Sequence, residues 1–282
     1  MMDGSHIANR EFFKLNGYLL VPGVLNNSEV KELRERSLEI FKSGEWKRSA
    51  FNTENILSDV FNTFPEYIAI TLKPAVLEHV RNLLGDDPVL LPETAVHHNF
   101  YAGWHKDTTS QERAGYQFHK NVNALMIEAG FYLQENSGHG GGLTVMEGSH
   151  LTPDPFLIPA KEPGILQRIR RKLLPNSVKA DRVMNPFGHK ITDIRSKAGD
   201  LVIFDFRLNH KATRPASGDL KDIPFGKNKI AFFNAFSVHN ETADLYLDYI
   251  YSRKEPFYQH LRDTPRNPQL LKHANLHSFT VR

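Results

Sequence analysis

From residue 88 onward the sequence alternates between short apolar runs and turns rich in glycine, proline, asparagine and aspartate. A series of short strands separated by such turns is typical of a β-sandwich or a jelly roll. We therefore predict a mainly β protein with flanking helices. The segments with the length and composition of strands are 88–100, 122–133, 142–146, 190–195, 200–206 and 229–238.

Helices are predicted on both sides of this strand-rich region. Asn26, followed three residues later by Glu29, has the pattern of a capping box at a helix start. A second helix is predicted from Pro74, which is tolerated in a first turn, to Gly85, a common stop. We expect both helices to pack on the outside of a sheet. Apolar residues between 245 and 257 predict one more helix near the C-terminus.

The chain of 282 residues is long enough for one large domain with a substantial core. We expect a single domain over 1–282, with a mostly helical part at 1–87 and a β core at 88–240. A C-terminal helix and tail are expected at 241–282. Residues 151–189 interrupt the strand pattern with proline-rich and basic sequence. We interpret them as a lid-like insertion over the mouth of a barrel.

Charge and hydropathy limit the partners. No stretch approaches about 18 uninterrupted apolar residues, and the first residues lack the apolar core of a signal peptide. We therefore expect a cytoplasmic protein, a monomer or homodimer, that acts on a small molecule and binds neither membrane nor nucleic acid; a net charge of +3 is too small to argue for the latter. A basic cluster is either a solvated helix face or a rim that attracts an anionic substrate. Its members are Arg168, Arg170, Arg171 and Lys172.

Three side chains, His105, Asp107 and His210, are candidate metal ligands. His105 and Asp107 lie two residues apart, so on a strand or at its end their side chains point to the same face. His210 follows a turn and an apolar strand-like run at 199–206, which can place it on a neighbouring strand. Without cysteine, any metal site in this chain must use His, Asp or Glu. Two histidines and one carboxylate form the facial set that leaves positions open on Fe(II).

A His-x-Asp triplet alone is also found in surface turns, but here three further segments accompany it in order. They are 17–23 (GYLLVPG), 140–150 (GGGLTVMEGSH) and 199–204 (GDLVIF), the last leading into His210. With these segments the sequence resembles the phytanoyl-CoA dioxygenase family of Fe(II)/2-oxoglutarate oxygenases over most of the chain. The resemblance implies a double-stranded β-helix, which is a compact, cupin-like jelly roll.

The resemblance also implies an activity. His105, Asp107 and His210 would bind Fe(II), and the protein would use 2-oxoglutarate and O2, with ascorbate assisting. Release of succinate and CO2 would accompany hydroxylation of an unactivated C–H bond in a small molecule that could be anionic. Relatives that halogenate have a small residue at the carboxylate position, so Asp107 favours hydroxylation. Family members act on many kinds of substrate, so the resemblance does not identify this one.

The residue that binds the distal carboxylate of 2-oxoglutarate departs from the family pattern. The family usually has an arginine about ten residues after the distal histidine. Here leucine and lysine occupy those positions, inside a segment, 217–227, that we interpret as an insertion. Lys229, at the start of the next strand, is then expected to replace the arginine, although lysine lacks its bidentate fork. Arg214 is the first alternative, and Lys227 is the second.

Other candidates come from position relative to these landmarks. Asn99 stands where related hydroxylases have an asparagine that contacts 2-oxoglutarate; the alternative is a structural role at a strand end. Thr213 lies one residue from the position at which relatives have a serine or threonine near the distal histidine. The residues expected to line a substrate cavity are Trp104, Arg207 and Gln134.

Two alternatives to hydroxylation remain open on the sequence. The first is a cupin-like barrel that binds a ligand without catalysis. The second keeps iron and 2-oxoglutarate but changes the outcome to desaturation, epimerisation or cyclisation, because that outcome depends on where the substrate lies relative to the metal.

Overall fold

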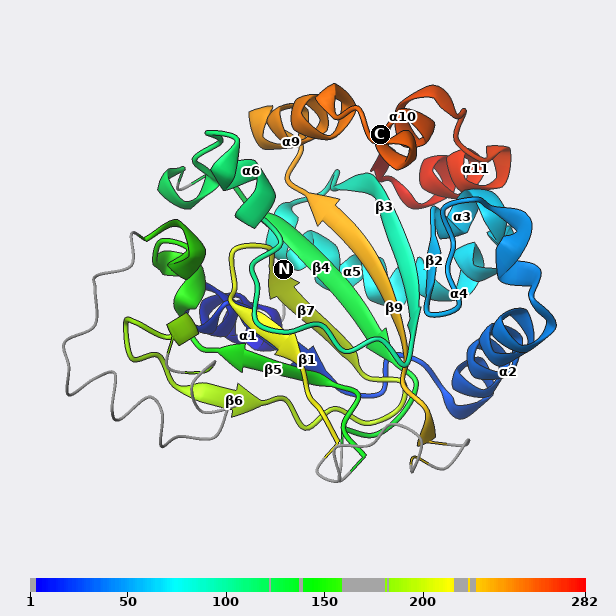
Figure 1. Cartoon of the computed structure of the whole chain (residues 1–282), viewed down its shortest axis with the longest axis horizontal. Coiled ribbons are helices and arrows are strands. Elements are labelled where there is room, and N and C mark those ends of the chain that lie inside the picture. The colour runs from blue at the N-terminus through cyan, green and yellow to red at the C-terminus, as the bar shows by residue number, and fades with distance from the viewer. Residues whose placement is uncertain are drawn as a thin grey trace.

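Two β-sheets form the centre of the molecule in the computed structural model, which describes residues 4–121, 123–136, 139–158, 181, 183–215, 223 and 227–282 (Figure 1). The larger sheet has the order β1-β7-β4-β9-β3-β10, and β2 also pairs with β3. Its pairings are antiparallel except that of β10 with β3. The strands are β1 Tyr18–Val21, β2 Ile56–Ser58, β3 Val89–His98, β4 Met126–Tyr132, β7 Leu201–Asp205, β9 Ile230–Ser237 and β10 Thr280–Val281.

The smaller sheet has the order β6-β5-β8 and is fully antiparallel. Its strands are β5 Leu143–Met146, β6 Ile191–Asp193 and β8 His210–Ala212. Each of the six segments that the sequence predicts to be strands contains one of the observed strands β3, β4, β5, β6, β7 and β9. The fold is therefore a mainly antiparallel β structure with flanking helices, as predicted.

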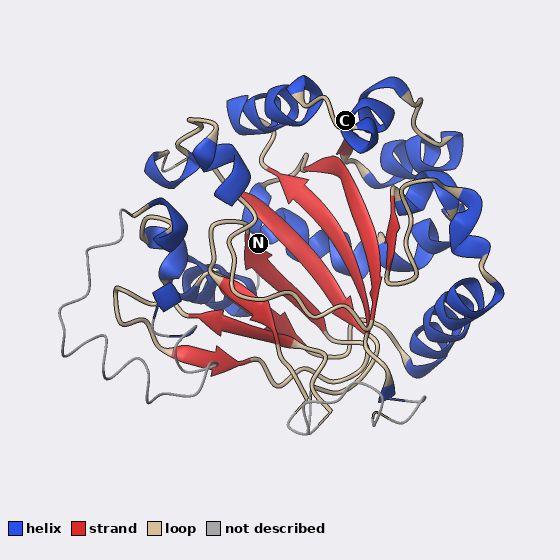
Figure 2. Ribbon diagram, viewed as in Figure 1, coloured by secondary structure: helices blue, strands red, loops and turns tan. Residues whose placement is uncertain are grey.

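Helices surround the strands (Figure 2). In Figure 1, α5 lies behind the larger sheet, while α9, α10 and α11 gather at one end of it. The α-helices are α1 Gly4–Asn16, α2 Asn27–Ser43, α3 Val60–Thr63, α4 Ile68–Thr71, α5 Pro74–Leu84, α6 Thr109–Arg113, α9 Glu241–Ser252, α10 Pro256–Asp263 and α11 Pro268–His277. Short 3-10 turns lie at Glu45–Arg48, Pro65–Tyr67, Phe118–Lys120, Ser149–Leu151 and Pro155–Leu157.

The two helices predicted before the strands are confirmed. The Asn26 side chain accepts hydrogen bonds from the Ser28 and Glu29 backbone N–H groups, and Glu29 accepts one from the Asn26 N–H, which completes the capping box. The chain after α9 differs from the expected tail, because α10 and α11 occupy much of it. Pro256 and Pro268 stand in the first turns of these helices, a helix-start signal that the predicted tail did not take into account.

The two faces of the larger sheet have different roles. Along β4, Ile127, Ala129 and Phe131 face the helices and are fully buried with residues of α2 and α5. The alternate residue Tyr132 packs on the opposite face with Leu143 of β5 in a second apolar cluster. Because side chains alternate along a strand, one face of the sheet anchors the helices while the other is free to build a site.

The lid-like insertion and the loop before β9 fall largely outside the described residues. For the lid, 159–180 and 182 are not described, and this range includes the basic cluster at 168–172. For the loop at 217–227, only 223 and 227 are described. Within the described part of the chain, no helix is long and apolar enough to cross a membrane.

Gly17 marks a tight junction between α1 and β1. Its backbone is left-handed (φ +81°), and a Cβ placed there would lie 2.5 Å from His150 Nδ1 and 2.8 Å from Leu208 Cδ1. The His150 ring is held by Nε2, which lies 3.0 Å from the Lys14 carbonyl at the end of α1. The ring therefore has little room to move away, and only glycine fits at this position.

Gly17→Ala should lower the free energy of unfolding by about 2–4 kcal/mol, because it adds a clash to the cost of a left-handed alanine. The matched control is Gly23→Ala, which also has a positive φ but has no atom within 4 Å of the added Cβ. It should cost only about 1 kcal/mol. Urea unfolding of both variants measures the difference; equal losses would mean that the contact with His150 is unimportant.

Candidate metal centre

A reciprocal pair of backbone hydrogen bonds holds His105 beside His210. The His105 N–H donates to the His210 carbonyl at 3.0 Å, and the His210 N–H donates to the His105 carbonyl at 2.9 Å. Two residues on, the Asp107 N–H donates to the Phe206 carbonyl at 2.8 Å. His105 thus lies in an isolated β-bridge to β8, not in a longer strand. The bridge sets the two imidazoles side by side, with ring centroids 4.3 Å apart.

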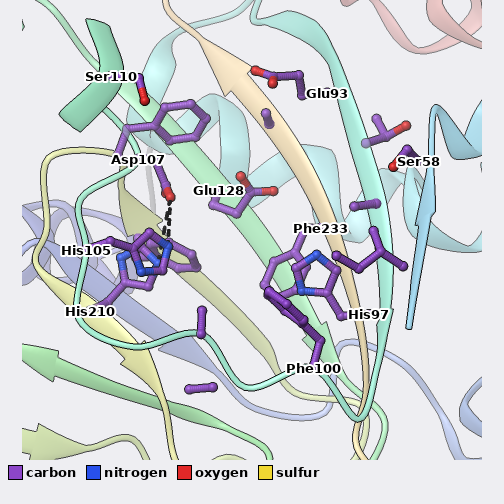
Figure 3. A pocket seen from close by; sticks show the side chains of 18 of the residues that line it. Ser58, Glu93, His97, Phe100, His105, Asp107, Ser110, Glu128, His210 and Phe233 are labelled. Atoms are coloured by element: carbon purple, nitrogen blue, oxygen red, sulfur yellow. Dashed lines mark ion pairs between the residues drawn. The ribbon is translucent and has the colours of Figure 1, made fainter. Parts of the chain in front are cut away.

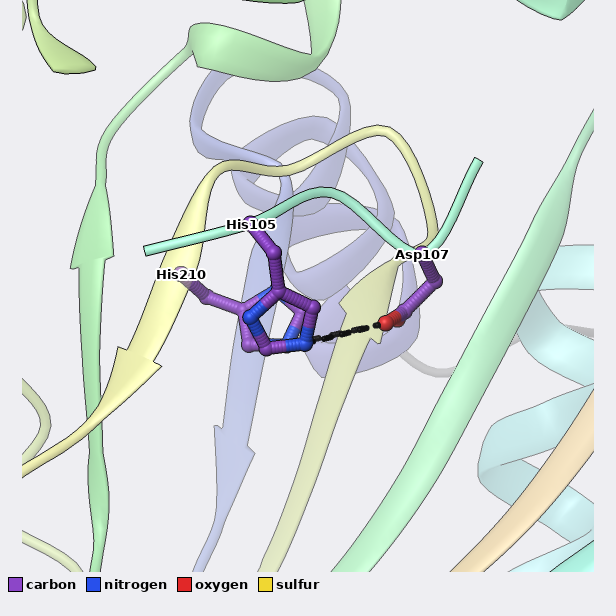
Figure 4. Close-up of side chains that lie close together, drawn as sticks. All are labelled: His105, Asp107 and His210. Atoms are coloured by element: carbon purple, nitrogen blue, oxygen red, sulfur yellow. Dashed lines mark ion pairs between the residues drawn. The ribbon is translucent and has the colours of Figure 1, made fainter. Parts of the chain in front are cut away.

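The three side chains converge on one point (Figure 4). Asp107 Oδ1 lies 3.5 Å from His105 Nε2 and 3.8 Å from His210 Nε2. One candidate ligand atom from each residue lies within 4.8 Å of the others. Ligand atoms at right angles around one ion at about 2.1 Å would be about 3.0 Å apart, so the two distances to Asp107 would shorten by less than about 1 Å on metal binding.

The other nitrogen of each histidine has its own partner. His105 Nδ1 lies 2.7 Å from the Gly103 carbonyl, and His210 Nδ1 lies 3.0 Å from the Leu208 carbonyl. A carbonyl only accepts, so each Nδ1 carries a proton and, in the neutral ring, each Nε2 has a free lone pair. Backbone carbonyls that fix the tautomer in this way are the usual outer partners of metal-binding histidines. The donor set therefore fits a divalent metal ion.

Burial and the neighbouring charges act in opposite directions on these groups. Burial lowers the pKa of His210, and with His105 as a neighbouring cation the pKa is about 4. Burial alone would also lower the pKa of His105, but the adjacent Asp107 outweighs it and the pKa is raised. Burial would raise the pKa of Asp107, but His210 and His105 outweigh it and the pKa is lowered. An ionised carboxylate beside a neutral His210 is the state that a metal requires.

The three side chains open onto a cavity of about 380 Å³. Its walls come from the inner faces of β3, β4, β7 and β9, from the smaller sheet, and from α6, α9 and α10. Figure 3 shows the three ligand candidates on one side and His97, Phe100 and Phe233 on another. A cavity of this size that combines apolar walls with a few polar groups is typical of a small-molecule binding site.

Lys229, which we expect from the sequence to anchor the cosubstrate, lies in the lining of this cavity. Its side chain is 3% exposed, and its Nζ donates to the Phe100 carbonyl at 2.7 Å. Burial lowers the pKa of the ammonium group to about 7. Asn99 holds the backbone of this lysine, because Asn99 Oδ1 accepts from the Lys229 N–H at 3.1 Å and the Asn99 N–H donates to the Lys229 carbonyl at 2.9 Å. The amide oxygen is thereby occupied at the strand end.

The other candidates for cosubstrate binding lie away from the cavity lining. Arg214 is exposed, and so is Lys227. Thr213 Oγ1 lies 2.9 Å from Thr144 Oγ1 in the smaller sheet and accepts a hydrogen bond from Asn136 at 3.2 Å. Its hydroxyl therefore links elements of the fold.

The three residues expected to contact substrate do not line the cavity, because each is used structurally. Trp104 Nε1 donates to Asp181 Oδ1 at 2.5 Å, and its ring packs in a cluster with two methionines. Arg207 forms a two-point ion pair with the buried Asp205, at 2.8 and 2.6 Å. Gln134 accepts from the Ile230 N–H at 2.7 Å and donates to the Gly141 carbonyl at 3.0 Å.

The structure adds polar cavity residues that the sequence reasoning missed. They include Ser58, Glu93, Thr94, His97, Ser110, Gln111, Glu128, Tyr246, Arg253 and Tyr258. Glu128 alternates with apolar residues in β4, a pattern that could have identified it as inward-facing once the outward face was known. Tyr246, Arg253 and Tyr258 gave no such signal, because the approach of α9 and α10 to the sheet depends on how the chain after β9 folds back.

Comparison with known proteins gives a family match. Residues 13–222 match the family model described as Phytanoyl-CoA dioxygenase (PhyH). Among curated proteins, no match to the sequence was found.

Several solved structures share the fold at low sequence identity. The epimerase SnoN, crystallised with Fe3+, alpha ketoglutarate and nogalamycin RO, has a TM-score of 0.56 at 15% identity, over 83% of this chain and 84% of that chain. The non-heme alpha ketoglutarate dependent carbocyclase SnoK from nogalamycin biosynthesis has a TM-score of 0.55 at 16% identity, over 84% of each chain. EctD from S. alaskensis with bound Fe has a TM-score of 0.55 at 16% identity, over 84% of this chain and 77% of that chain.

The metal prediction follows from the three converging side chains. Wild-type protein should bind one Co(II) or Fe(II) per chain, and His105→Ala, Asp107→Ala and His210→Ala should each weaken binding by at least about a hundredfold, because the set of three is broken. Anaerobic equilibrium dialysis measures this. His239→Ala, at a surface histidine paired with Asp87, is the control and should bind as wild type does. If one of the three variants binds the metal as tightly as the wild-type protein does, the residue changed in it is not a metal ligand.

Proposed function

The chain belongs to the phytanoyl-CoA dioxygenase family of Fe/2-oxoglutarate-dependent enzymes, and from this we propose that it hydroxylates an unactivated C–H bond of a small molecule, with release of succinate and CO2. One observation carries the proposal. Two histidine Nε2 atoms and a carboxylate oxygen face one another at the edge of a cavity large enough for a small organic molecule. A metal bound by three side chains keeps positions open for a cosubstrate and O2.

We further interpret the two sheets as a double-stranded β-helix. The apolar cluster that joins Tyr132 and Phe204 of the larger sheet to Leu143 and Val145 of the smaller one supports this interpretation. The β-bridge between His105 and His210 supports it as well, because it links the chain after β3 to the smaller sheet. A cavity between two facing sheets is where this fold would hold a metal.

In the proposed mechanism the protein holds and orients the reactants. His105, Asp107 and His210 would hold iron, with both imidazoles fixed by backbone carbonyls. Bound ferrous iron, with 2-oxoglutarate and O2, supplies the oxidative decarboxylation that drives substrate oxidation. Phe204 and Phe206, which line the cavity, are placed to keep water from the reacting atoms.

Lys229 is proposed to bind the distal carboxylate of 2-oxoglutarate. It is a buried cation within the cavity, and it is close enough to His210 to lower the pKa of that imidazole. Among the described residues its Nζ donates one hydrogen bond, to the Phe100 carbonyl, which leaves donor capacity for a carboxylate. Asn99 is proposed to position this lysine through its backbone. We propose no cosubstrate contact for Arg214 or Thr213.

A second outcome of the same cofactor chemistry is supported by a specific observation. Two structures with this fold are an epimerase and a carbocyclase, both described as alpha ketoglutarate dependent. Epimerisation or ring closure would use the same metal ligands and the same lysine, and would differ in which substrate carbon faces the iron. Product analysis by mass spectrometry separates them, because hydroxylation adds one oxygen atom and the other outcomes do not.

The test of the cofactor assignment is an anaerobic titration of the iron-loaded protein with 2-oxoglutarate, followed by the weak visible charge-transfer band. Lys229→Met should raise the 2-oxoglutarate dissociation constant by roughly 10- to 100-fold, because an ion pair in a buried site is lost. Arg214→Ala is the matched control and should change it little. The reverse result would move the anchor to Arg214, and failure of folded, iron-loaded wild-type protein to form the band would favour a binding barrel.

Binding of 2-oxoglutarate should also depend on pH through Lys229. The protonated lysine binds the carboxylate, and its pKa of about 7 in the free protein means that affinity is highest below this value. Between pH 6 and pH 8 the protonated fraction falls, and affinity should fall with it by roughly tenfold. Lys229→Arg stays charged over this range, so its affinity should be nearly constant. If the arginine variant keeps the wild-type pH dependence, another group is titrating.

A further inference from the structure

Two glutamates, Glu128 and Glu93, contribute carboxyl groups to the cavity wall. This wall is the face of the larger sheet that α2 and α5 do not cover. Glu128 projects from β4 into the space between the metal-ligand candidates and β9 (Figure 3). It pairs across the sheet with Phe204 on one side and Ala235 on the other, and both neighbours also line the cavity. Glu93 comes from β3 beside an irregularity in the register with β9, between Leu90 and Thr94.

Glu128 has no partner among the described residues. Its Oε1 is inaccessible and accepts no hydrogen bond. The charged groups that act on it, Asp107 and Glu93, are both acidic. Burial, followed by these two neighbours, raises the pKa of Glu128 well above its ordinary value. A buried carboxyl group without a compensating partner is costly to the fold, and such groups cluster at functional sites.

Glu93 is partly compensated by its neighbours. The Tyr246 hydroxyl of α9 donates to Glu93 Oε2, and Arg253 is the cation that acts on it. The hydrogen bonds of Arg253 go elsewhere, to Glu255 at 3.2 Å and to the hydroxyls of Tyr249 and Tyr258 at 3.2 Å each. Burial still raises the pKa of Glu93. The single positive charge of Arg253 is therefore shared among several acceptors. No cation among the described residues is paired with Glu128.

The cavity thus has two electrostatic regions. Lys229 lies near His210 and suits a carboxylate. Glu128 and Glu93 share another part of the wall, where the described cation, Arg253, already binds Glu255, Tyr249 and Tyr258. An anionic group placed against this wall would disfavour ionisation of the two carboxyl groups still further. A cationic group would gain a charge-assisted hydrogen bond and would compensate the buried carboxylates.

We propose that the substrate carries a positively charged nitrogen, as a protonated amine or a related cation, which binds Glu128 with Glu93 as the second carboxylate. This inference rests on the proposed function, because it names the substrate class of that cavity. It differs from the anionic substrate that the basic residues at 168–172 suggested, and those residues lie outside the described part of the chain. In this proposal Glu128 selects the substrate by its charge. His105, Asp107 and His210 only hold the metal and have no part in that selection.

The experiment uses three probes of equal length and different charge: hexylammonium, hexan-1-ol and hexanoate. Each is titrated by calorimetry into the full-length protein, loaded anaerobically with Fe(II) and saturating 2-oxoglutarate, so that Lys229 is already covered. Hexylammonium should bind roughly tenfold or more tightly than hexan-1-ol, and hexanoate should bind least. Equal binding of the first two probes, or tightest binding of hexanoate, would overturn the proposal.

Glu128→Gln keeps the size of the side chain and removes its ability to ionise beside a bound cation, and it should abolish the preference for hexylammonium. Glu32→Gln makes the same change at an exposed position on α2 and should keep the preference. Glu93→Gln should reduce the preference by a smaller factor and provides the test if the first variant does not fold. A preference that survives in both cavity variants would contradict the proposal.

The two proposals fail in distinguishable ways. If wild-type protein forms no iron and 2-oxoglutarate band, the proposed function fails. Hexylammonium and hexan-1-ol are then compared in the metal-free protein, where Glu128 and Glu93 are still present. A cation preference there that Glu128→Gln removes supports the charge of the ligand independently of the reaction, and its absence overturns the inference.

Discussion

The reciprocal backbone bridge between His105 and His210 is the constraint on which the candidate metal centre depends. It joins two segments separated by about a hundred residues, so it specifies a long-range contact and not a local motif. Once the bridge forms, the imidazoles must be neighbours, and the i, i+2 spacing directs Asp107 to the same point. The carbonyls of Gly103 and Leu208, each two residues before its histidine, then fix the tautomers. A few backbone groups thereby determine which lone pairs are available.

The sequence predicts the backbone elements of this structure better than it predicts the partners of individual side chains. Strand positions, the capping box at Asn26 and the i, i+2 pairing of His105 with Asp107 follow from periodicity and spacing, which are local properties, whereas the grouping of His210 with them rests on the resemblance to a known family as well. Trp104, Arg207 and Gln134 illustrate the opposite case. Trp104 and Gln134 bind partners that only the folded chain brings near, such as Asp181 for Trp104 and Ile230 for Gln134, whereas Arg207 pairs with Asp205, two residues away. Sequence shows that a polar group is present, but not whether a distant partner already satisfies it.

The same limit explains why Glu128 was missed. A polar residue alternating with apolar ones in a strand usually indicates a solvent-facing position. Here the inner face of the sheet encloses a cavity, so the alternation separates a helix-covered face from a site-forming face. The C-terminal helices had no sequence signal that ties them to the cavity either. Tyr246 and Arg253 reach it because α9 and α10 pack at one end of the larger sheet (Figure 1).

The irregularity in β3 between Leu90 and Thr94 has a consequence for how such an enzyme can change. It lies near Glu93 and within the strand that, beyond its end, leads to His105. A shift of one residue at this irregularity would exchange the side chains presented to the cavity while the β-bridge kept the metal ligands in place. Substrate preference and oxidative chemistry are therefore mechanically separable, so that selection for a new substrate can act on one wall while the reaction centre is inherited intact.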